Sequence, residues 1–223
     1  MIERFPSEDE ATAYSVYQRL SEFVSEFEER TTASGALEAI LDGDEFLGGY
    51  VNQKPEFFTE KQLIEPVLDA LGYREVRWRP HNLIKDEQNQ PDFQILDPPP
   101  QTLCIVESKR LGRKGDGKKQ VERYLRQDTF VKYATNHDCR YLVGIGTDGI
   151  DWSLSAKPLG VAEPVELATV TIEDELLTLV HAHRRQTEPP ERLVQDTRDS
   201  LRDGLASGLA KHNLRRTLRD CFE

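Results

Sequence analysis

The sequence predicts an α/β protein in which helices flank a central mixed sheet, with further helical extensions at both ends of the chain. Three observations predict this class. Apolar residues recur at helical spacing near both ends of the 223-residue chain. Between residues 75 and 154 they form short strand-like runs instead. One helical stretch, residues 116–135, interrupts those runs, which is the order expected of a sheet covered on both faces.

Composition narrows the functional classes. The chain carries 29 basic and 40 acidic residues, a net charge of −11, so its bulk charge alone does not favour nucleic acid. No run approaches the roughly 18 apolar residues of a membrane span, and the acidic start lacks the apolar region of a secretory signal. The three cysteines are scattered, which argues against a disulfide framework or a structural zinc site. We therefore expect a cytoplasmic protein with no membrane partner.

The first third of the chain is predicted to be helical. Residues 1–55 form an N-terminal helical extension, in which the stretch 11–29 places Tyr14, Tyr17, Leu20, Val24 and Phe27 on one face. A second helix is expected to begin at Thr59, because Thr59-Glu60-Lys61-Gln62 fits a capping box, and to end at Gly72. Pro66 should kink that helix or end its first half.

The middle of the chain, residues 56–170, is predicted to be the core domain. Residues 81–90 read as a polar connection, and residues 147–149 as a hairpin turn. Strands are expected at Glu75–Arg79, Asp92–Leu96, Gln101–Lys109, Arg140–Ile145 and Ile150–Leu154, with one helix over Asp116–Thr135. Residues 158–164 look like a linker. The C-terminal segment, residues 171–223, is expected to hold a helix over 171–185, a break at 187–190 and a further helical stretch over 191–221.

Charged residues stand at the end of the most apolar of these strands. Glu107 and Lys109 are two residues apart, so a strand places them on one face. If the strands at 92–96 and 101–109 pair as a hairpin, Asp92 lies beside Glu107. Two such carboxylates repel each other unless a divalent cation lies between them, and oxygen ligands with open positions suit Mg²⁺ or Mn²⁺. The alternative is an ordinary salt-bridged strand end.

These residues also resemble a known signature. Pro91-Asp92 followed by Glu107-Ser108-Lys109 resembles the motif of the PD-(D/E)XK nuclease superfamily, which has the restriction-endonuclease-like fold. The stretches 60–73, 120–124, 133–136 and 146–152 are similar to further motifs of the N-terminal nuclease domain in type I restriction R subunits and type IIG restriction enzymes. The resemblance covers roughly residues 59–155.

The resemblance implies a role for each matching residue. Asp92, Glu107 and the backbone carbonyl of Ser108 would hold Mg²⁺ (or Mn²⁺), while the Ser108 side chain would point away from the site. Glu60 would contact the metal directly or through water, and Lys109 would position the attacking water. Gln120 and Tyr124 would hold the DNA backbone or the scissile phosphate, although a surface glutamine and a core tyrosine are nearly as plausible from the sequence.

Basic residues gather just after the motif in this acidic chain. They form an expected DNA-binding stripe that consists of Lys109, Arg110, Arg113, Lys114, Lys118, Lys119, Arg123 and Arg126. Arg74, Arg77 and Arg79 could add to it.

We therefore expect a Mg²⁺-dependent endodeoxyribonuclease with a role in restriction or defence. A non-catalytic DNA-binding or assembly module of a restriction system and a DNA repair nuclease are the alternatives. Methyltransferase, helicase or specificity subunits acting in trans are conceivable partners, and a homodimer is left open.

Overall fold

A computed structural model describes residues 6–31, 33–81, 83, 90–185 and 190–223. Most of the expected polar connection at 81–90 and of the break at 187–190 lies outside the described residues. No helix in the described part of the chain is long and apolar enough to cross a membrane.

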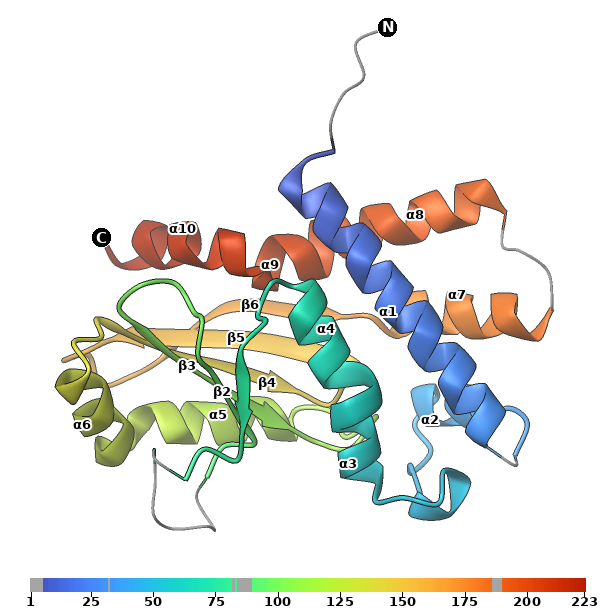
Figure 1. Cartoon of the computed structure of the whole chain (residues 1–223), viewed down its shortest axis with the longest axis horizontal. Coiled ribbons are helices and arrows are strands. Elements are labelled where there is room, and N and C mark those ends of the chain that lie inside the picture. The colour runs from blue at the N-terminus through green and yellow to red at the C-terminus, as the bar shows by residue number, and fades with distance from the viewer. Residues whose placement is uncertain (1–5, 32, 82, 84–89, 186–189) are drawn as a thin grey trace, which may run out of the picture.

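Six strands form one mixed sheet, which confirms the α/β class (Figure 1). Along the sheet they follow chain order and are β1 (Val76–Trp78), β2 (Phe93–Ile95), β3 (Thr102–Ser108), β4 (Tyr141–Thr147), β5 (Asp151–Pro158) and β6 (Val165–Thr171). Only β3 and β4 are parallel, and every other neighbouring pair is antiparallel. A parallel pair needs a crossover connection, which the helices between β3 and β4 supply.

That crossover contains two helices rather than the single one expected. α5 (Asp116–Arg126) and α6 (Asp128–Asn136) are separated at Gln127, whose backbone is extended. α5 lies close against β4, because an added Cβ on Gly146 would come within 2.5 Å of the Lys118 nitrogen. The glycines at 144 and 146 therefore serve the packing of α5, and this packing sets the position of the side chains that α5 presents.

The helix before the sheet begins earlier than the sequence indicated. α3 (Pro55–Thr59), a π-helical turn (Glu60–Ile64) and α4 (Glu65–Ala70) follow one another without a break. Thr59 is thus inside the helix and not its cap, and its hydroxyl donates to Pro55 O and accepts from Leu111 N. The prediction of a capping box at Thr59 was therefore wrong. The helix continues through Pro66, and the π-helical turn lies just before that proline.

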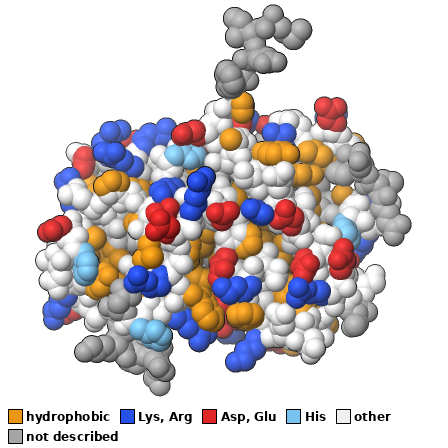
Figure 2. Space-filling model, viewed as in Figure 1, with side chains coloured by type: hydrophobic (Ala, Val, Ile, Leu, Met, Phe, Trp, Pro, Cys, Tyr) orange, Lys and Arg blue, Asp and Glu red, His pale blue; other side chains and the backbone are white. Residues whose placement is uncertain are grey.

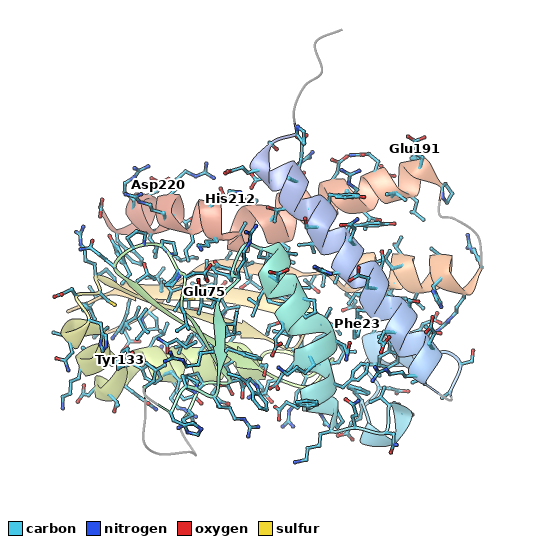
Figure 3. All side chains as sticks on the ribbon, in the orientation of Figure 1. Phe23, Glu75, Tyr133, Glu191, His212 and Asp220 are labelled. Atoms are coloured by element: carbon cyan, nitrogen blue, oxygen red, sulfur yellow. The ribbon has the colours of Figure 1, made fainter. Side chains whose placement is uncertain are left out.

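Further helices lie on the side of the sheet opposite α5, and several of them pack against α1 rather than directly on the sheet (Figure 1). They are α1 (Glu8–Arg30), α2 (Ala36–Leu41), α7 (Glu173–Arg184), α8 (Glu191–Leu201), a π-helical turn (Arg202–Ala206), α9 (Ser207–Leu209) and α10 (Lys211–Phe222), with a short 3-10 turn at Gly48–Tyr50. Phe23 projects from α1 toward α3, where its ring centroid lies 6.3 Å from that of Phe58 (Figure 3). The expected C-terminal helix is interrupted at Ala210, whose backbone is extended.

Each face of the sheet has its own hydrophobic core. Cys104 and Val106 of β3 belong to the larger core, which includes residues of α1, α4 and α7–α10. Leu103 and Ile105 belong to the smaller core beneath α5 and α6. The alternation of side chains along β3 therefore determines which face the charged residues at its end can reach. β6 was not expected from the sequence, and it follows the loop at 158–164.

Candidate active site

Asp92 and Glu107 lie next to each other at one end of the β2–β3 pair. Phe93 pairs with Val106 in the antiparallel register, so the residue before β2 stands opposite Glu107. Asp92 is held there by the backbone of the neighbouring strand, because Ser108 N donates to Asp92 Oδ2 at 2.8 Å. The hairpin pairing that the sequence suggested thus brings together the two acids 15 positions apart in the chain.

Glu60 and Ser108 meet on the opposite face of β3. The Ser108 side chain points away from the Glu107 face, as alternation requires, but it does not leave the group of predicted site residues. Its hydroxyl lies 2.7 Å from Glu60 Oε1 and 2.8 Å from Asp92 Oδ2. Glu60, in the π-helical turn, therefore adjoins Asp92 through Ser108. The expectation that this side chain plays no part in the site needs correction.

Two carboxyl groups of the site, those of Glu107 and Glu60, have a raised pKa, chiefly because they are buried. Burial raises the pKa of Glu107 to about 8, and the nearby charge of Asp92 adds to this effect while Lys109 opposes it. Burial also raises the pKa of Glu60, which the Ser108 hydroxyl opposes and the charges of Asp92 and Glu56 increase. Burial and the nearby negative charge thus disfavour the ionised forms of Glu107 and Glu60, and an added positive charge would favour them.

The carboxylate oxygens of Asp92 and Glu107 are the side-chain groups of the site that could hold a hard cation. Glu107 Oε2 is buried and has no hydrogen-bond partner in the described structure, so a carboxylate oxygen is left for another ligand. Among the described residues, no group of three or more His, Cys, Asp and Glu side chains is arranged to hold a metal ion. Mg²⁺ commonly uses only one or two protein carboxylates and completes its coordination with water and substrate phosphates. Asp92 and Glu107 meet that smaller requirement.

Lys109 lies on the Glu107 side of β3. Its backbone N–H donates to Thr147 O at 2.8 Å, which continues the pairing of β3 with β4, and its amine pairs with Glu107 Oε1. The side chain is about one-sixth exposed, with 16% of its area accessible, so the amine borders solvent while its partner Glu107 is buried. This places one ammonium between the acids and the surface.

Two adjoining cavities open around Lys109, and we call them together the basic cleft. The larger, ≈ 650 Å³, is lined by Gln53, Lys54, Pro55, Glu56, Phe57, Glu60, Trp78, Arg79, Lys109, Arg110 and Arg113. The smaller, ≈ 530 Å³, is lined by Glu56, Lys109, Arg113, Asp116, Lys119, Gln120 and Arg123. They share Glu56, Lys109 and Arg113, so the cleft runs from the α3 side of the site to α5.

The expected stripe of cations divides between different surfaces. Arg110, Arg113, Lys119 and Arg123 line the basic cleft. Lys118 lines a separate cavity with Asp148 and Asp151, and its amine pairs with Glu166 of β6. Lys114 and Arg126 pair with Glu173 and Glu163. Acidic and basic side chains are mixed over the face drawn in Figure 2, so the grouping in the cleft is local.

Several cations of the cleft form no ion pair with the described residues. Among the residues that the structure describes, Lys54, Arg79, Lys119 and Arg123 have no acidic partner within 4.0 Å. Arg110 pairs with Glu45, and Arg113 pairs with Asp116. Ion pairs at this degree of exposure are weak and can be exchanged for a phosphate.

Gln120 and Tyr124 lie one helical turn apart on α5 but in different surroundings. Gln120 lines the smaller cavity beside Lys109, and its Nε2 donates to Tyr124 Oη at 2.7 Å. Tyr124 is fully buried, and its hydroxyl donates to Gln90 O at 2.9 Å. Burial raises the pKa of Tyr124 to about 12, with a contribution from Glu107. A direct contact of Tyr124 with DNA does not fit this burial, so we assign it to holding Gln120.

The side chains at 148–152, in and just after the predicted hairpin turn, form hydrogen bonds within the turn itself. Asp148 Oδ1 accepts hydrogen bonds from Ile150 N and Asp151 N, at 2.9 and 2.7 Å. Trp152 Nε1 donates to Gly149 O at 3.2 Å. This stretch therefore stabilises the β4–β5 connection, which in turn supports Lys109 through Thr147.

Trp78, Phe57 and Lys54 line the cleft but were not singled out from the sequence. Trp78 and Phe57 are each 40% exposed, and their ring centroids lie 6.1 Å apart. The run Arg77-Trp78-Arg79, an aromatic residue between two cations, is the only local signal that could have indicated them. Nothing in the sequence places Phe57 near Trp78.

Comparison of the chain with protein-family models, with curated proteins and with solved structures finds no match.

Proposed function

We propose that this chain is a divalent-cation-dependent nuclease that hydrolyses phosphodiester bonds in DNA, built on a restriction-endonuclease-like core. The observation that carries the proposal is the arrangement of Asp92, Glu107 and Lys109 at one end of β2 and β3, with the basic cleft around Lys109. The β2–β3 pairing and the parallel β3–α5–β4 crossover support the proposed core.

Each residue has a task in this proposal. Asp92 and Glu107, with the Ser108 carbonyl oxygen, would hold Mg²⁺ or Mn²⁺. A bound cation of this kind lowers the pKa of its water and stabilises the charge that develops on a phosphate. Lys109 would orient the attacking water and stabilise that same charge. Lys119 and Arg123 would bind phosphate groups of the DNA backbone.

The test uses the full-length chain with supercoiled, linear and single-stranded DNA, each with Mg²⁺, with Mn²⁺ or with EDTA, over a series of salt concentrations. Cleavage that needs the metal and is lost in Asp92→Asn and Glu107→Gln supports the proposal. The two substitutions preserve side-chain shape, so their folding can be compared with the parent by circular dichroism.

Salt-sensitive DNA binding with no cleavage under any of these conditions would contradict the proposal and favour a non-catalytic DNA-binding module. Equal cleavage by the parent and Asp92→Asn would contradict the assignment of the site. Restriction, defence and repair nucleases share this chemistry, so the biological role remains a prediction from the resemblance.

A further inference from the structure

The larger cavity of the basic cleft contains a pair of exposed aromatic rings, and Glu60 and Lys109 line the same cavity. Trp78 ends the edge strand β1 and Phe57 belongs to α3, and the two rings meet edge to face. Single exposed aromatic side chains are ordinary on protein surfaces. Trp78 also contacts the Lys61 amine, 5.1 Å from its ring centroid, and hydrogen-bonds Glu60, yet both rings keep 40% of their area in solvent where they line one cavity with Glu60 and Lys109.

The charges around these rings favour an anionic ligand. Five cations line the cavity, namely Lys54, Arg79, Lys109, Arg110 and Arg113, against the two acids Glu56 and Glu60. The guanidinium of Arg79 lies 4.7 Å from the Trp78 ring centroid and has no acidic partner in the described part of the chain. The Arg79 and Trp78 side chains are both exposed, so the Arg79 guanidinium can leave the ring and bind a phosphate. The cavity thus combines an aromatic surface with an excess of positive charge.

From this combination we propose that Trp78 and Phe57 form a stacking site for an unpaired nucleobase, so that the chain takes DNA with a single-stranded segment into the basic cleft. Nucleobases stack on aromatic side chains whatever their sequence, while cations follow the backbone phosphates. A base within a duplex is already stacked on its neighbours and cannot use these rings. The volume, ≈ 650 Å³, is within the range of pockets that enclose small ligands.

This inference rests on the proposed function and specifies its substrate. It also defines where the strand lies. A base stacked on Trp78 would share a cavity with Lys109, so the Lys109 amine is available to its phosphates. The adjoining nucleotides would then pass Arg113 and enter the smaller cavity. There Lys119 and Arg123 would bind their phosphates.

The chain provides its own spectroscopic reporter. It has two tryptophans, of which Trp78 is exposed and Trp152 is fully buried. Tryptophan emission is measured in EDTA while the full-length chain is titrated with a single-stranded oligonucleotide, with an abasic oligonucleotide of the same length and with the matching duplex. We expect saturable quenching by the single strand only, because the abasic chain and the duplex offer phosphates without an unpaired base. Trp152 contributes a constant background.

Substitutions test the same point by affinity, measured as the anisotropy of a labelled oligonucleotide. Trp78→Ala and Phe57→Ala should each weaken single-strand binding about tenfold and change abasic binding less than twofold. Trp78→Phe should retain most of the affinity. Tyr14→Ala is the matched control, because Tyr14 is also exposed, at 45%, and also lies beneath a guanidinium, that of Arg198, but on α1 outside the cleft. It should bind like the parent.

Equal quenching by the abasic oligonucleotide or the duplex, or unchanged single-strand affinity of both folded alanine variants, would overturn the stacking site. This result is distinct from failure of the nuclease proposal. Metal-dependent cleavage without base-dependent quenching would support the nuclease proposal and contradict the stacking site. Base-dependent quenching without cleavage, with any of the metals, would support the stacking site and contradict the nuclease proposal.

Discussion

The Ser108 hydroxyl lies 2.7 Å from Glu60 Oε1 and so joins β3 to the π-helical turn of residues 60–64. The same oxygen is 2.8 Å from Asp92 Oδ2. The hydroxyl has a single proton to donate and lies within hydrogen-bond distance of both carboxyl groups, which couples the positions of the two acids. The side chain of Ser108 acts on the site through its neighbours and is a positioning residue.

Ser108→Ala should lower both stability and cleavage. Removing the hydroxyl leaves a buried carboxyl without its partner, which costs about 1–3 kcal/mol. We expect this loss in urea unfolding without metal, and a fall in kcat of roughly tenfold with little change in KM, because Ser108 itself lines neither cavity of the basic cleft. Ser108→Thr should recover part of kcat.

Ser155→Ala is the matched control for that substitution. Ser155 is also a buried serine of the sheet, at 1% exposure, but its hydroxyl has no partner in the described structure. Its removal should leave stability unchanged or higher. If Ser108→Ala is as harmless as Ser155→Ala, the link to Glu60 has no energetic weight.

Lys109→Ala should abolish cleavage while leaving DNA affinity within twofold of the parent. One ammonium among several cations adds little to binding, whereas in the transition state its loss can lower the rate on the order of 10²–10³-fold. Cleavage is followed on supercoiled DNA and affinity by anisotropy in EDTA. Parental cleavage rates in Lys109→Ala at matched metal and salt would remove Lys109 from the catalytic residues.

Lys119→Ala and Lys118→Ala should differ although the two lysines are adjacent. Lys119 lines the basic cleft, while Lys118 lines another cavity and pairs with Glu166. We expect only Lys119→Ala to weaken DNA binding and to reduce the slope of log K against log salt by about 1. Equal slopes for the two variants would show that DNA does not follow the cleft along α5.

Asp148→Asn should change how stability depends on pH. Burial raises the pKa of Asp148 to about 6, against an ordinary value of 3.8, despite opposing backbone hydrogen bonds. The folded chain therefore binds this proton more tightly than the unfolded chain, and its contribution to stability falls as pH rises through that interval. The amide oxygen of Asn can still accept from Ile150 N and Asp151 N.

Relative to the parent, Asp148→Asn should gain on the order of 1–3 kcal/mol of unfolding free energy between about pH 4 and pH 7. Urea unfolding of both proteins across this range measures the difference, in which the contributions of all other carboxyl groups cancel. A difference that stays constant with pH would show that Asp148 titrates alike in both states.

The local pattern of the sequence determined most of the helices and strands, and it also determined that Asp92 and Glu107 lie close together. The apolar run before Glu107 and the turn residues after Ile95 predict a paired β2 and β3, and that pairing alone brings Asp92 to Glu107. Such features depend on neighbours within a few residues, through strand alternation and turn chemistry. The limits of α3, the break at Gln127 and the presence of β6 were less evident, because tertiary contacts outweighed weak local preferences.

Only the tertiary structure decided how the remaining side chains are used. The Ser108 hydroxyl, Lys118 and Trp78 find their partners in Glu60, Glu166 and Phe57, which lie 48, 48 and 21 positions away in the chain. No periodicity encodes such distances. Adjacent cations on α5 diverge because successive helical positions point about 100° apart, so one faces the cleft and the other faces β6. The sequence gives the charge of each residue, but tertiary packing determines which group forms an ion pair with it.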